Sequence, residues 1–201
     1  MSSSIDRPQS ADLTGSVKNA ALTVGGGVSL LWLMFVAQTL SFGLMDGLAI
    51  APRTLTGLIG VLFAPLLHGS IGHIVGNTVG FAVLAPLTML RKRMDFWVVT
   101  LFSAVSSGLG AWLLGASGSL HLGASGVIFG YLGFLMARGL FERRVGAILL
   151  SAVVTLLFGS MVFGIFPILA GVGVSWQAHM FGFVGGVGTA RLLGTEIRKR
   201  S

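Results

Sequence analysis

The stretch "HLGASGVIFG", His121 to Gly130, places a single serine between small residues in a strongly apolar part of the chain. Gly126 and Gly130 are four residues apart, so they share one face of a predicted helix, with Ser125 at the edge of that face. Small residues on one face let two helices approach closely inside a membrane. This stretch therefore predicts a helix that packs backbone to backbone against a partner.

A second glycine face lies near the end of the chain. In "AHMFGFVGG", His179, Gly182 and Gly186 share one face of a predicted helix. Because both faces carry small residues, we expect these two helices to be neighbours. Their contact would bring His179 close to Ser125.

The composition indicates an all-α polytopic membrane protein. Of 201 residues, 54% are apolar and 9% are charged, whereas about 25% of residues are charged in soluble domains. Six apolar segments approach the ~20 residues needed to cross a bilayer. They are residues 28–45, 69–90, 96–114, 124–137, 145–165 and 176–193.

The chain is predicted to form one membrane domain, residues 20–194, between a flexible cytoplasmic tail, 1–19, and a short basic cytoplasmic tail, 195–201. Residues 47–68 are predicted to form a first loop that dips into the membrane, because a proline and a histidine interrupt a long apolar run. The first span is interpreted as an uncleaved signal anchor. No internal repeat indicates a two-fold transporter.

The basic residues predict the orientation. Twelve of the thirteen Lys and Arg residues fall on one side of the six-span arrangement, and only Arg53 falls on the other. The positive-inside rule then places both termini in the cytoplasm. It also accounts for the net charge of +7 without a nucleic-acid partner. We expect an integral membrane protein of a prokaryotic plasma membrane.

No carboxylate lies inside the apolar segments. This pattern argues against an aspartyl protease, an HExxH metalloprotease and a carboxylate proton relay. The chain has no cysteine, and nothing in the sequence predicts a metal or a cofactor. A serine in a span is ordinarily a packing residue, but a histidine or asparagine there is costly. The polar candidates are His68, His73, Asn77, Ser125 and His179.

Three motifs together resemble the rhomboid intramembrane serine proteases. They are "HGSIGHIVGN" at residues 68–77, "GASG" at 123–126 and "AHMFGFVGG" from residue 178. The resemblance implies a six-transmembrane-helix bundle and a Ser/His dyad, with Ser125 as the nucleophile and His179 as the general base. It also implies that His73, Asn77 and the backbone N–H of Ser125 stabilise the oxyanion.

The resemblance also assigns supporting residues. His68 would hold the local network and its water, and Gly123 belongs to the serine motif. Phe129 stands where the family commonly has a tyrosine that stacks on the catalytic histidine. Of the family's Trp-Arg pair in the first loop only Arg53 is present. His121 is interpreted as an interfacial residue without such a role.

The implied substrates are transmembrane segments of other proteins, cut near the outer face of the bilayer. The fifth span, with Phe158, Phe163 and Phe166, is a candidate lateral gate, although these aromatic side chains fit a lipid-facing surface equally well. The sequence does not predict the oligomeric state.

Two other functions stay open at this point. One is a catalytically inactive relative that binds membrane helices, and the intact Ser125 and His179 argue against it. The other is a small channel or transporter, which the lack of repeats and of carboxylates inside the spans weakens.

Overall fold

The computed structural model describes residues 9–171 and 173–200, and this part of the chain is helical, with one isolated bridge between Ile50 and His121. The all-α prediction is confirmed. The α-helices are α1 (Gln9–Leu40), α2 (Leu55–Phe63), α3 (Ile71–Thr88), α4 (Arg93–Leu114), α5 (Ser125–Glu142), α6 (Val145–Phe158) and α7 (Trp176–Arg200). Short 3-10 segments are η1 (Asp46–Leu48), η2 (Ala64–Leu66) and η3 (Gly159–Ile165).

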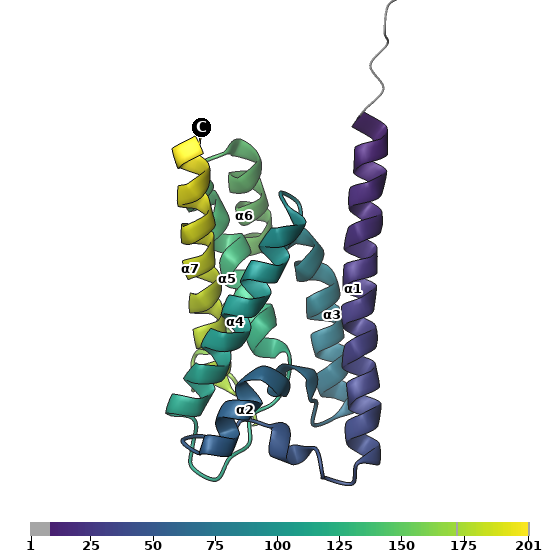
Figure 1. Cartoon of the computed structure of the whole chain (residues 1–201). Helices are drawn as coiled ribbons and strands as arrows, with labels where there is room; N and C mark the ends of the chain where they lie inside the picture. The colour runs from purple at the N-terminus through teal and green to yellow at the C-terminus, as the bar shows by residue number, and fades with distance from the viewer. Residues whose placement is uncertain (1–8, 172, 201) are drawn as a thin grey trace, which may run out of the picture.

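Helix α5 forms the centre of the bundle. It packs against α3, α4, α6 and α7, whereas α1 stands at one edge and packs mainly on α3 (Figure 1). The side chains of Tyr131, Leu132, Phe134 and Leu135 in α5 are fully buried. An apolar helix enclosed on all sides in this way is fixed by packing rather than by its own helical propensity.

Four helical stretches are long and apolar enough to cross a membrane: Thr14–Leu40, Ile71–Thr88, Arg93–Leu114 and Val145–Ile165. Helices α5 and α7 coincide with the fourth and sixth predicted segments and lie in the same bundle. The count of six spans stays a prediction. The predicted first loop folds as η1, α2 and η2 across one end of the bundle (Figure 1), and its membrane depth also stays a prediction.

The terminal helices are longer than the sequence suggested. Helix α1 begins at Gln9, so residues 9–19 of the expected flexible tail are helical, while residues 1–8 lie outside the described part. Helix α7 likewise continues to Arg200, through most of the expected basic tail. Extending an existing helix adds one hydrogen bond for each residue fixed, which costs far less than starting a new helix.

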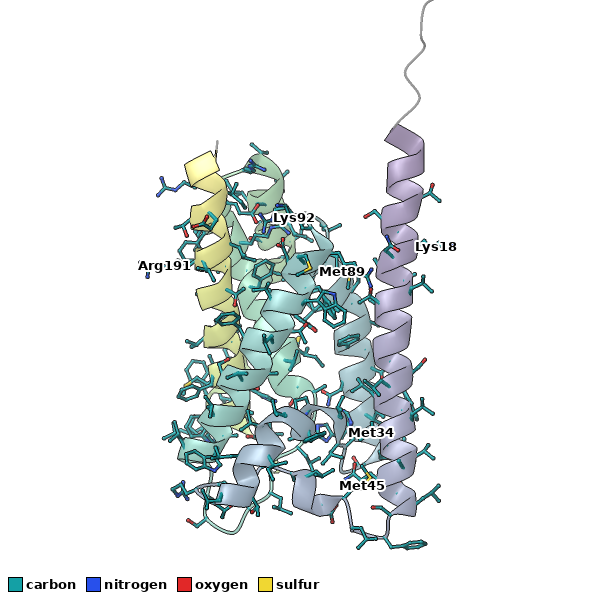
Figure 2. The ribbon with its side chains drawn as sticks, viewed as in Figure 1. Lys18, Met34, Met45, Met89, Lys92 and Arg191 are labelled. Carbon is teal, nitrogen blue, oxygen red and sulfur yellow. The ribbon has the colours of Figure 1, made fainter. Side chains whose placement is uncertain are left out.

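The two ends of the bundle differ in charge. Figure 2 places Lys18, Lys92 and Arg191 toward one end, and Met34 and Met45 toward the other. This agrees with the distribution of basic residues in the sequence.

Two buried carboxylates also lie at the basic end. Asp95 receives two hydrogen bonds from Arg91, at 2.6 and 2.7 Å. Glu142 accepts from Nε of Arg138 at 2.6 Å. Because each carboxylate is matched by a guanidinium one turn away, burial leaves no unpaired charge.

Helices α5 and α7 meet backbone to backbone through their glycines. A Cβ built on Gly182 would collide with the carbonyl oxygen of Gly126, and one on Gly186 with that of Gly130. No side chain larger than hydrogen fits at either position without moving a helix. The two glycine faces therefore set the distance between α5 and α7.

We predict that Gly182→Val lowers the free energy of unfolding by about 1–3 kcal/mol, the usual cost of overpacking. The matched control is Gly188→Val in the same helix, because a Cβ at Gly188 meets nothing within 4 Å. Thermal unfolding of both variants in detergent measures the difference. Equal midpoints for the two variants would contradict the close-packing argument.

Candidate active site

One open cavity brings together residues from three separate motifs. It has a volume of about 630 Å³, and His73, Ser125 and His179 all line it. These side chains come from the beginnings of α3, α5 and α7. The topology therefore collects the predicted serine and two of the predicted histidines around one space.

The turn before α5 fixes the position of Ser125. The N–H of Gly123 donates to the carbonyl of Ala64 at 2.8 Å, and Gly123 has φ +117°, which favours glycine. A Cβ at Gly123 would press on the ring of His73 and contact the amide of Asn77. Helix α5 then begins at Ser125, where the first N–H groups of a helix lack intrahelical acceptors.

Helix α3 presents His73 and Asn77 to the same turn. Ser70 caps the helix, since its hydroxyl accepts from the N–H of His73 at 3.2 Å. Asn77 follows one turn later and is buried. Its amide nitrogen has no hydrogen-bond partner among the described residues. A buried donor in this state costs about 1–3 kcal/mol, which suits an atom that bonds during a reaction.

The ring of His179 is held on two sides. It stacks on Phe129 with centroids 4.0 Å apart and planes 9° from parallel. Its Nδ1 lies 3.1 Å from the carbonyl oxygen of Gly164 in η3. Because a carbonyl oxygen only accepts, Nδ1 carries the proton and Nε2 keeps a free lone pair. The stack expected from Phe129 is present without a tyrosine hydroxyl.

His68 lies behind the cavity rather than in its wall. Its side chain is buried, and its ring centre is 5.1 Å from that of His73. The backbone N–H of His68 donates to the side chain of Gln38 at 2.9 Å. Neither ring nitrogen has a partner among the described residues.

His121 is a cavity residue that sequence reasoning missed. It is half-buried, and its ring bonds the hydroxyls of Ser119 at 2.9 Å and Ser175 at 2.7 Å. Burial lowers the pKa of the His121 imidazole, which favours its neutral form. Ser175 lies just before α7, so this bond ties the outer loop to the helix that carries His179. The interfacial position of His121 stays a prediction, and its partner Ser175 is 54 residues away in the sequence.

Arg53, which the sequence sets apart from the other basic residues, binds the end of α4. Its guanidinium donates to the carbonyls of Leu113 at 2.9 Å and Gly115 at 2.7 Å. These carbonyls lack intrahelical donors, and a cation there also suits the helix dipole. The indole of Trp112 donates to the carbonyl of Thr54 at 2.8 Å and closes the same junction.

The cavity contains no acidic side chain among the described residues of its lining. Within residues 9–171 and 173–200, no three His, Asp or Glu side chains converge as a metal site would require. The cavity therefore offers a serine hydroxyl and imidazole groups in one lining.

Known proteins are similar in sequence to most of this chain. Residues 53–196 match the model of the Rhomboid domain. The uncharacterized protein Rv1337 of Mycobacterium tuberculosis is 40% identical over 197 residues, covering 92% of this chain and 82% of that protein. The uncharacterized protein ML1171 of Mycobacterium leprae is 36% identical over 178 residues, covering 86% and 70%. A Bacillus subtilis protein named "Putative rhomboid protease YdcA" is 28% identical over 123 residues, covering 60% of each chain. The Rhomboid domain model thus covers most of this chain. The chain, an integral membrane protein, belongs to the rhomboid family.

Proposed function

We propose that the chain is a rhomboid-type intramembrane serine endopeptidase that hydrolyses transmembrane segments of other proteins near the outer face of the bilayer. The observation that carries the proposal is the single cavity lined by His73, Ser125 and His179. The family and the relative named as a rhomboid protease support it.

The proposed reaction passes through an acyl-enzyme. Oγ of Ser125 attacks the scissile carbonyl carbon while Nε2 of His179 takes the hydroxyl proton. The C–N bond then breaks, and His179 returns the proton to the leaving amine. A water molecule then attacks the ester carbon while the same imidazole takes its proton. The bond between that carbon and Oγ of Ser125 breaks, His179 returns the proton to Oγ, and the new carboxyl end of the substrate leaves.

The proposal assigns three donors to the oxyanion. They are the N–H of Ser125 at the start of α5, the ring of His73 and the amide of Asn77. The unpartnered amide nitrogen of Asn77 supports this role most directly. Donors that the fold holds in place would need no rearrangement when negative charge develops. His68, packed against His73, would hold that ring and a water molecule in place.

The charge of the two bundle ends supports the proposed orientation. Helix α5 begins at the cavity with Ser125 and ends just before Arg143 and Arg144. If the basic end faces the cytoplasm, the cavity lies toward the outer face. The proposal includes six spans, cytoplasmic termini and a plasma-membrane location. Phe163 and Phe166, both exposed beside the outer end of α6, fit a lateral entry route.

We predict that Ser125→Ala and His179→Ala each abolish cleavage of a model transmembrane substrate. The double variant should be little worse than either single one, because the two groups act as a unit. Ser125→Ala should also abolish labelling by a serine-directed fluorophosphonate, with little change in thermal stability.

The matched control is Ser160→Ala, which removes an exposed hydroxyl from η3. It should keep both cleavage and labelling. Proteolysis that persists in a clean Ser125→Ala preparation would overturn the proposal. Substrate binding without cleavage or labelling by the unaltered chain would instead favour an inactive relative.

We predict that Asn77→Ala slows kcat by about 10²-fold with little change in KM, as loss of an oxyanion donor does. Steady-state cleavage rates measure both constants. Asn19→Ala, which removes an exposed amide from α1, is the control and should be unchanged. A parallel loss of thermal stability and activity would make Asn77 a structural residue.

We predict that reporter fusions after Arg93 and Arg144 give a cytoplasmic signal and that a fusion near Ala116 gives an external one. The reason is the gathering of basic residues at one end of the bundle. An external signal after Arg144 would remove the basis for placing the cavity at the outer face.

A further inference from the structure

We propose that the groove between α1 and α4 binds one anionic phospholipid, with an acyl chain along the groove and the phosphate at Arg93. The groove has a volume of about 410 Å³ and is separate from the cavity of the proposed active site. This binding site does not depend on the proposed protease activity.

The groove exists because α1 leans on α3 and stands away from α4 (Figure 1). Gly27 of α1 touches α3, since a Cβ there would meet the ring of Phe81. Gly26 faces the groove, and a Cβ there would meet nothing within 4 Å. Residues of α1 from Leu22 to Leu31 form one wall of the groove. This wall extends for about 14 Å at the helical rise of 1.5 Å per residue.

The floor of the groove is apolar. Phe81, Phe96 and Tyr131 line it and pack on one another, with ring centres 5.8–6.2 Å apart. The hydroxyl groups in the lining already have partners. That of Tyr131 bonds Thr100 at 2.8 Å, and that of Thr23 donates to the carbonyl of Asn19 at 2.8 Å. The floor therefore suits a hydrocarbon chain better than a ligand that needs hydrogen bonds.

The mouth of the groove is positively charged. Arg93 is exposed and lines the groove at the first residue of α4, where helix N–H groups also favour an anion. The nearby carboxylate of Asp95 is already bound by Arg91. None of the described residues that line the groove is acidic. A guanidinium binds phosphate with two parallel hydrogen bonds.

The lining of the groove matches the two parts of a lipid. Arg93 is the charged residue among those that line the groove, and most of the other lining residues offer apolar surface. An acyl chain that carries an anionic headgroup fits both features. Arg93 also lies at the basic end, which the proposed topology places in the leaflet that carries anionic lipids.

The test is lipid retention by the full chain, purified from equal amounts of phosphatidylglycerol and phosphatidylcholine and measured by native mass spectrometry. We expect one phosphatidylglycerol per chain in preference to phosphatidylcholine. Arg93→Gln should reduce its retention at least about fivefold, the effect of one basic residue near an anionic surface. Arg144→Gln, which removes an exposed charge from the same end, is the control and should retain the lipid.

A second variant tests the acyl chain separately. Gly26→Leu fills the groove where the structure leaves open space, so it should lower retention while thermal stability stays unchanged. Equal retention of the two lipids by the unaltered chain would overturn the proposal. So would equal losses in Arg93→Gln and Arg144→Gln, because general surface charge would then explain the binding. The measurement needs no cleavage and can be repeated on Ser125→Ala.

Discussion

The contact between Gly126 in α5 and Gly182 in α7 is the constraint on which the proposed site depends. Ser125 directly precedes the first glycine, and His179 lies three residues before the second. The position of the hydroxyl relative to the imidazole is therefore set by how closely two backbones approach. In a membrane, where helices gain little from hiding apolar surface from each other, this close approach is itself a principal source of helix association. One contact thus serves both packing and the site.

The site also orients a histidine without a buried carboxylate. A carboxylate beside His179 would need desolvation at a depth where unpaired charge is expensive. The carbonyl of Gly164 accepts from Nδ1 at no ionisation cost, and the stacked ring of Phe129 limits rotation of the imidazole. The carboxylates that the fold does bury, Asp95 and Glu142, lie far along the chain from this cavity and are paired with arginines.

The sequence predicted the features that depend on local spacing. Periods of three and four residues predict the helical faces that carry Gly126 and Gly182. The same periods predict the helical segments near the start of each motif. The sequence could not predict the hydrogen-bond partners of His121 and His179. Ser175 reaches His121 from a loop, and the partner of His179 is the backbone carbonyl of Gly164, so neither leaves a side-chain pattern in the sequence. The early start of α1 was missed for another reason: polar residues before a span fit a tail and a helical extension equally well.

The ends of the helices give the proposed site its electrostatic character. At the start of α5 the N–H groups lack intrahelical acceptors, so Ser125 lies where developing negative charge is stabilised. At the end of the stretch formed by α6 and η3 the carbonyls lack donors, so Gly164 lies where a proton and positive charge on His179 are stabilised. In the proposed reaction, attack of Ser125 on the substrate carbonyl with transfer of its proton to His179 would create this pair of charges. Two opposed helix ends therefore favour the same charge separation, and neither requires an ionised side chain in the resting protein.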